Sequence, residues 1–160
     1  MKQARCKKQL ALAFAAGASV GYVSEGPHAV AISDEIKKLS GGEGVDVVYD
    51  AVGGAYAEPA VRALAWKGRY LVVGFPAGIP KIPLNLTLLK GSQIMGVFWG
   101  AHTAREPKVH AENMADLFRM YADGQIKPRI SARYPLEKAA DALNLMQDRK
   151  VQGKVVLDVQ

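Results

Sequence analysis

Short apolar runs alternate with amphipathic segments along almost the whole chain. The runs 45–49, 70–73 and 92–98 are rich in β-branched or aromatic residues, and glycine or polar residues bound each of them. Such runs are typical of parallel strands that are buried on both faces. Because helical signals lie between them, the pattern predicts an α/β fold, in which a parallel sheet carries flanking helices.

The remaining elements follow from apolar spacing and from glycine or proline at segment ends. The predicted helices cover residues 6–16, a segment from Pro27 to Leu39, 56–66, a segment from Pro107 to Gly124, and 136–146. Shorter strands are predicted at 20–23, 130–134 and 154–159. Three prolines between Pro76 and Leu89 predict a long loop there.

Glycines follow two of the predicted strands, and these positions carry the functional signal. Gly53-Gly54 comes shortly after the run that ends in Asp50, and Gly74 comes directly after the next strand. Ligands of open parallel sheets bind at the carboxyl ends of the strands. The pattern therefore predicts a nucleotide-binding sheet, although no G-x-G-x-x-G fingerprint stands between a strand and a helix.

Composition narrows the class of partner. The net charge of +6 suits an anionic partner such as a phosphorylated cofactor, and it would also suit nucleic acid. The basic residues are spread along the chain; the one dense cluster, 2–8, has no interleaved aromatic residues and is typical of a solvated helix end, so we do not expect nucleic acid as a partner. No apolar run approaches the roughly 20 residues that cross a bilayer. The single cysteine, Cys6, excludes an intrachain disulfide and favours a reducing cytoplasm.

An ordered set of segments identifies a family. The set consists of Gly44–Gly54, Gly68–Phe75, Leu117–Gly124, Ile126–Pro128, Tyr134–Leu143 and Gly153–Leu157. In this order it resembles the quinone-oxidoreductase type of the medium-chain, zinc-type alcohol dehydrogenase superfamily, over nearly the whole chain. The resemblance implies an NADPH-dependent enzyme that transfers hydride from nicotinamide to a quinone or another conjugated carbonyl compound.

The resemblance also implies an organisation. Residues 1–160 correspond to a partial Rossmann-type cofactor domain, without the family's first strand, glycine fingerprint and catalytic lobe, and 125–160 form the carboxyl-terminal segment that returns toward that lobe. We expect the chain alone to be inactive, with weak or absent NADPH binding. The alternative is a non-catalytic dimerisation or interaction module, and in either case we expect a homodimer through Ile79–Phe98.

The resemblance places cofactor contacts where three strands end. These candidates are Val52, Gly53, Gly74, Phe75, Phe98 and Trp99. Each of these residues also has a structural interpretation. The glycines would form tight turns, Phe75 would be a core residue, and Phe98 and Trp99 would belong to a subunit contact. Tyr49 and Asp50 have no partner at suitable spacing and are interpreted as the end of a strand.

Two basic residues complete the set of cofactor candidates. Arg149 matches a basic residue near the cofactor in related reductases, and a solvated helix end is its alternative. Lys8, in a register shared with Lys7 and Gln9, falls where NADPH-preferring relatives place a lysine for the 2′-phosphate. The sequence indicates no catalytic acid or base and no metal ligand, since its three histidines lack metal-ligand spacing.

Overall fold

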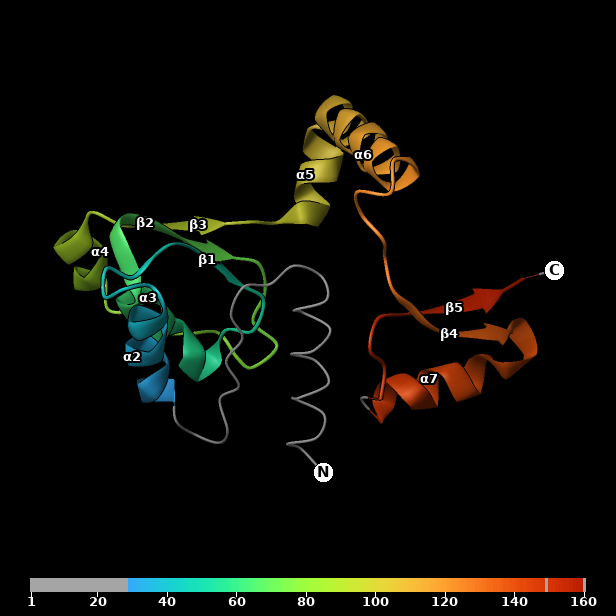
Figure 1. Ribbon diagram of the computed structural model, residues 1–160, viewed down its shortest axis with the longest axis horizontal. Coiled ribbons are helices and arrows are strands. Elements are labelled where there is room, and N and C mark those ends of the chain that lie inside the picture. The colour runs from blue at the N-terminus through green and yellow to red at the C-terminus, as the bar shows by residue number, and fades with distance from the viewer. Residues whose placement is uncertain (1–28, 149, 160) are drawn as a thin grey trace. The chain divides into compact units, whose positions relative to one another are not determined.

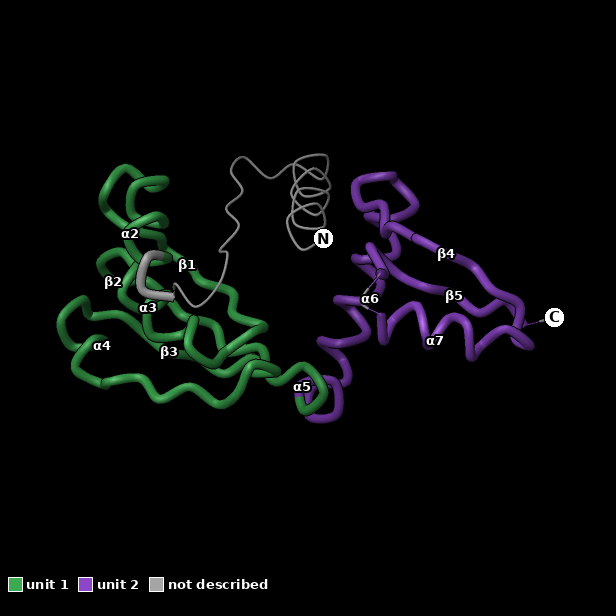
Figure 2. The backbone as a smooth tube through the Cα atoms, turned by 90° about the horizontal axis from the view of Figure 1, so that it is seen from below, with its two compact units in different colours: residues 1–101 green, residues 102–160 purple. Residues whose placement is uncertain are grey.

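The computed structural model describes residues 29–148 and 150–159. The chain divides between Ala101 and His102 into two compact units, coloured green and purple in Figure 2. The first unit contains α2 (Ala29–Leu39), β1 (Val45–Asp50), the 3-10 helix η1 (Gly54–Tyr56), α3 (Ala57–Arg62), β2 (Leu64–Val72), α4 (Asn85–Lys90) and β3 (Gln93–Gly96) (Figure 1). Helix α5 (Trp99–Arg105) crosses the boundary.

The three strands of the first unit form a parallel sheet. Its order is β1-β2-β3, so β2 lies in the middle and pairs with both neighbours in the parallel sense. Helix α3 packs against β1, β2 and α2, and α4 packs against β2 and α3. The α/β class and the parallel sheet predicted from the sequence are confirmed.

A small apolar core lies between the sheet and its helices. It consists of Ala57, Val61, Leu64, Tyr70 and Leu86. Burying a side chain such as Val61 or Leu64 stabilises the fold by about 1.5–3 kcal/mol. The buried side chains of α3 and β2 therefore stabilise the unit that carries the predicted site.

The helix predicted at 56–66 was too long. Helix α3 ends at Arg62, and Leu64 already begins β2. Val61 and Leu64 have the spacing of one helical face, but Leu64 enters the core from an extended strand. Lys67 of β2 has a φ of +59°, and the ladder between β2 and β1 shifts register between Val45 and Val47.

The loop predicted between Pro76 and Leu89 was partly wrong, because it contains most of α4. This short helix starts after Pro83, buries Leu86 and ends at Gly91, whose φ is +57°. The Lys90 ammonium fixes it by donating hydrogen bonds to the carbonyl oxygens of Arg62, at 2.7 Å, and of Leu64. The sequence did not predict this helix because the neighbouring prolines are typical of a loop. Helix α5 was also not predicted.

The second unit pairs two further parallel strands. Its elements are α6 (Pro107–Ala122), β4 (Ile130–Pro135), the 3-10 helix η2 (Leu136–Lys138), α7 (Ala139–Gln147) and β5 (Lys154–Asp158). Helix α7 connects β4 to β5 and packs against both. The predicted carboxyl-terminal segment 125–160 falls within the range of this unit.

Helix α6 has the predicted start and end, with proline in its first turn and Gly124 at φ +70° just after it. Its apolar side chains Leu117, Phe118 and Tyr121 are exposed. Within the described ranges, no helix has the length and apolarity to cross a membrane. The predicted helix 6–16 and strand 20–23 lie outside the described residues.

Candidate functional site

Six of the predicted site residues lie at one edge of the first sheet. β1, β2 and β3 are parallel, so their carboxyl ends share an edge. Val52 and Gly53 follow β1, Gly74 and Phe75 follow β2, and Phe98 and Trp99 follow β3. The amide of Val97 extends the ladder by donating to the Val72 carbonyl at 2.9 Å. Lys8 and Arg149 lie outside the described residues.

The turn after β1 is packed directly against the loop after β2. Gly53 has φ +70° and ψ −147°, a backbone conformation that is essentially restricted to glycine. A Cβ at this position would lie 2.6 Å from the Phe75 Cβ and 2.9 Å from the Gly78 carbonyl oxygen. Gly53 is therefore required by the local geometry, and it brings Val52 and Phe75 into the same small region.

Backbone hydrogen bonds hold the two loops together. The Gly54 amide donates to the Gly78 carbonyl at 2.8 Å, and the Ala77 amide donates to the Val52 carbonyl at 3.0 Å. The Asp50 carbonyl accepts from Val73 at 2.9 Å. These bonds order both turns without using a side chain that faces solvent.

The Asp50 carboxylate ties the turn after β1 to the core of the sheet. Its Oδ1 accepts hydrogen bonds from the amides of Val52, at 2.7 Å, and Gly53, at 2.9 Å. Its Oδ2 accepts a hydrogen bond from the hydroxyl of Tyr70, a fully buried residue of β2. One side chain thus connects two strands and the glycine turn between them.

The same contacts shift two pKa values in opposite directions. Burial raises the pKa of Asp50, but hydrogen bonds from Tyr70 and from the Gly53 and Val52 amides outweigh it, so the pKa lies below its ordinary value. Burial raises the pKa of Tyr70 strongly, and the hydrogen bond to Asp50 and its negative charge raise it further. The pair is therefore a carboxylate and a neutral phenol over the whole physiological pH range.

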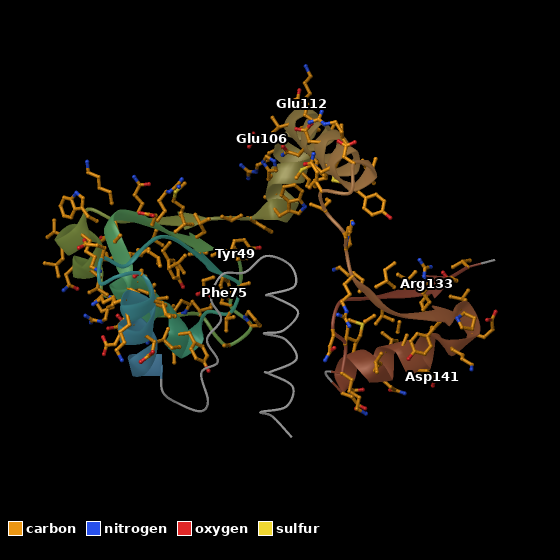
Figure 3. The ribbon with its side chains drawn as sticks, in the orientation of Figure 1. Tyr49, Phe75, Glu106, Glu112, Arg133 and Asp141 are labelled. Carbon is orange, nitrogen blue, oxygen red and sulfur yellow. The ribbon has the colours of Figure 1, made fainter. Side chains whose placement is uncertain are left out.

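Apolar side chains surround these turns and face solvent. Phe75 is 47% exposed, and Val52, Phe98 and Trp99 are also exposed. The prediction left open whether Phe75 is a core residue; its exposure excludes a fully buried position. Tyr49 and Phe75 are both labelled at this end of the first unit in Figure 3.

Gly74 differs from Gly53 in what surrounds it. A Cβ at Gly74 would lie 3.8 Å from the Ala51 carbonyl oxygen and 3.9 Å from the Pro76 Cδ, which are ordinary contact distances. Its φ is not positive. The backbone conformation and the contacts of this position therefore do not require a glycine.

Sequence reasoning missed the roles of Asp50 and Tyr70. Asp50 was interpreted only as the end of a strand, which it is, but it also caps the turn. An aspartate two residues before a turn amide often accepts its hydrogen bond, and this spacing could have signalled the cap. The link to Tyr70, 20 residues further along, depends on strand register and had no local signal.

Metal ligands do not cluster in this part of the protein. Among the described residues, no group of three or more His, Cys, Asp or Glu side chains could hold a metal ion.

Comparison with known sequences decides the family. Residues 24–157 match the zinc-binding dehydrogenase family. The chain belongs to this family. Two curated relatives are quinone oxidoreductase-like protein 2 of Rattus norvegicus, 38% identical over 157 residues, and its homolog in Nematostella vectensis, 35% identical over 147 residues. The matches cover 98% and 91% of this chain but 43% and 39% of those proteins, so the chain spans about two fifths of their length.

Solved structures agree with the fold. A probable oxidoreductase from Mycobacterium abscessus is 30% identical, with a TM-score of 0.75 over 94% of this chain and 43% of that chain. A mycobacterial protein solved in complex with NADPH is 26% identical, with a TM-score of 0.79 over 94% of this chain and 46% of that chain. The quinone-oxidoreductase resemblance and the Rossmann-like character predicted from the sequence are confirmed.

Proposed function

We propose that the first unit binds the nicotinamide and ribose half of NADPH in a reductase of quinones or other conjugated carbonyl compounds. Val52 and Gly53 would contact the ribose, and Gly74, Phe75, Phe98 and Trp99 would line the nicotinamide side. When bound, the cofactor supplies the hydride; the protein supplies position and a surface that excludes water. Lys8 and Arg149 remain proposed phosphate contacts, and residues 125–160 the proposed return toward a catalytic lobe.

The observation that carries this proposal is the contrast between Gly53 and Gly74. Gly53 is needed by the backbone, whereas a Cβ at Gly74 would meet only ordinary contacts. A glycine without a structural requirement, beside exposed Phe75 at the carboxyl end of a central strand, is typical of close approach by a ligand. The family and the NADPH bound to a mycobacterial relative support the choice of ligand.

Replacing Gly74 with valine tests this proposal. We expect NADPH affinity to fall at least about tenfold, because the added methyl groups occupy the space assigned to the cofactor. The free energy of unfolding should change by less than about 1 kcal/mol, since the Cβ has room. Affinity is measured by NMR titration and stability by urea unfolding. Unchanged affinity in the folded variant would contradict the proposal.

We also propose, as a second function, self-association through the segment Ile79–Phe98. β3 is an edge strand of the described sheet, and all four of its residues are exposed. Next to it, α4 exposes Leu88 and Leu89, with Leu88 81% exposed. An exposed edge strand with apolar neighbours is a common site of pairing between chains.

Replacing Leu88 with lysine is expected to convert a dimer into a monomer in sedimentation-velocity measurements at micromolar protein. The side chain makes little contact within its own unit, so unfolding should be unaffected. Glu43→Gln, which also raises the net charge by one at another exposed position of the same unit, serves as the control for the change in charge. A wild-type chain that sediments as a monomer, or a variant that stays dimeric, would contradict this assignment.

A further inference from the structure

The edge of the first sheet that carries the proposed nicotinamide site has one charged side chain. The segments at the carboxyl ends of its three strands are 49–56, 73–80 and 96–101. Together they contain a single residue of the types Asp, Glu, Lys and Arg, and that residue is Asp50. The electrostatic potential at this edge therefore depends first on the Asp50 carboxylate.

Neutral groups hold this carboxylate in place. Burial raises the pKa of Asp50, and the donors that lower it, the Tyr70 hydroxyl and the amides of Gly53 and Val52, are all uncharged. Within residues 29–148 and 150–159, no ion pair includes Asp50. Asp50 thus keeps its negative charge without a cation beside it, and its neutral partners orient that charge but do not cancel it.

The charge lies beside the backbone that we assign to the cofactor. Asp50 Oδ1 is 2.7 Å from the Val52 amide nitrogen and 2.9 Å from that of Gly53. Gly53 in turn packs against Phe75, since a Cβ there would lie 2.6 Å from the Phe75 Cβ. Asp46 is also in β1, but four residues nearer its start, which is roughly 13 Å along an extended strand.

A fixed negative charge distinguishes the two redox states of nicotinamide. The oxidised ring is a pyridinium cation, and the reduced ring is neutral. A carboxylate nearby lowers the free energy of the cation and has little effect on the neutral ring. Phe75, Phe98 and Trp99 are exposed at this edge, and they would displace water from a bound ring and so reduce the screening of the charge.

We propose that Asp50 strengthens binding of the oxidised nicotinamide ring at this edge relative to the reduced ring. This inference rests on the function proposed above, because it assumes that the edge binds nicotinamide. The role assigned to Asp50 is electrostatic, and its side chain transfers neither hydride nor a proton. Its charge would stabilise the ring cation that remains when hydride passes to the carbonyl compound.

The test compares two probes that differ by this one charge. They are nicotinamide riboside, a cation without a phosphate, and its neutral dihydro form, each titrated into the ¹⁵N-labelled full chain. Asp50→Asn keeps an acceptor oxygen for the two amides but removes the charge. We expect it to lower the ratio of oxidised to reduced affinity about threefold or more, since Asp50 is half-buried and solvent screens part of its charge.

Two control variants separate the local charge from other effects. Asp46→Asn makes the same charge change at an exposed position of the same strand and should leave the ratio within about twofold of wild type, since solvent screens a distant exposed charge. Tyr70→Phe removes the hydrogen bond to Asp50 but leaves its charge, so it should also preserve the ratio.

A measurement on the wild-type chain needs no variant. Salt at about 1 M, where the Debye length is about 3 Å, should weaken binding of the oxidised riboside and leave binding of the reduced riboside unchanged. This comparison decides the question even where Asp50→Asn fails to fold, which its amide spectrum would reveal.

The outcomes separate this inference from the function on which it rests. If neither riboside shifts the amides of Val52 and Gly53 in the wild type, both fail. If both ribosides bind there, three results would overturn the role of Asp50 alone. These are an unchanged ratio in Asp50→Asn, an equal fall of the ratio in Asp46→Asn or Tyr70→Phe, and oxidised-riboside affinity that is independent of salt.

Discussion

Replacing Gly53 with alanine is expected to lower the free energy of unfolding by about 2–6 kcal/mol. Two costs add. A residue other than glycine at φ +70° and ψ −147° is strained by about 1–3 kcal/mol. The new Cβ also lies 2.6 Å from the Phe75 Cβ, and such overpacking costs about 1–3 kcal/mol. Urea unfolding of the variant, followed by circular dichroism, measures the sum.

Gly78→Ala separates the two costs. Gly78 also has a positive φ, +111°, but a Cβ there meets no atom within 4 Å. We therefore expect this control to lose only the strain energy and to stay closer to wild type. Equal stability of both variants would show that contact between the turn after β1 and the Phe75 loop is not a structural constraint.

Replacing Asp50 with alanine is expected to cost about 2–4 kcal/mol. The substitution leaves the Tyr70 hydroxyl buried without its acceptor, and the amides of Val52 and Gly53 lose theirs. A buried polar group left unpaired costs about 1–3 kcal/mol. Asp46→Ala removes an exposed acid from the same strand and should change stability by less than about 0.5 kcal/mol.

A double-mutant cycle with Tyr70→Phe isolates the pair. Once Asp50 is absent, removing the Tyr70 hydroxyl should lower the free energy of unfolding little or even raise it. The coupling energy between the two substitutions should therefore reach about 1–3 kcal/mol. Additive effects of the two substitutions would exclude the hydrogen bond as a stabilising contact.

The pair also predicts how stability depends on pH. The native pKa of Asp50 lies below its ordinary 3.8, so its contribution is complete above about pH 4 and is lost as the pH falls through the depressed value. The native pKa of Tyr70 lies above its ordinary 10, so its contribution is complete below about pH 10 and is lost at higher pH. Asp50→Ala should reduce the loss of unfolding free energy at acid pH, and Tyr70→Phe should reduce the loss at alkaline pH. Urea unfolding over a series of pH values measures both.

The sequence predicted the sheet well because its signals are local. Strands buried on both faces leave continuous apolar runs, and β1 and the end of β2 were found in this way. The boundary between α3 and β2 was missed because Val61 and Leu64 have the spacing of one helical face. In the structure both side chains lie in the core, but Val61 belongs to α3 and Leu64 to β2. Tertiary packing decided that boundary, and it has no local signature.

The candidate site was predictable in part for the same reason. Glycines after strands mark the edge of the sheet, but the sequence does not distinguish a glycine required by the backbone, such as Gly53, from one that leaves room, such as Gly74. That distinction depends on the opposing loop. A groove of the first unit, lined by Ser33, by residues of 54–62 and by residues 77–81, was not found at all, since its walls come from three segments that are separated along the chain.

The most direct test of the account is a titration of the ¹⁵N-labelled chain with reduced nicotinamide mononucleotide, which carries only the half of the cofactor assigned here. We expect the amide signals of Val52, Gly53, Gly74 and Phe75 to shift together and to saturate with a single dissociation constant. Absence of shifts at millimolar ligand, or shifts that exclude the turns after β1 and β2, would contradict the assignment of this edge as a nicotinamide site.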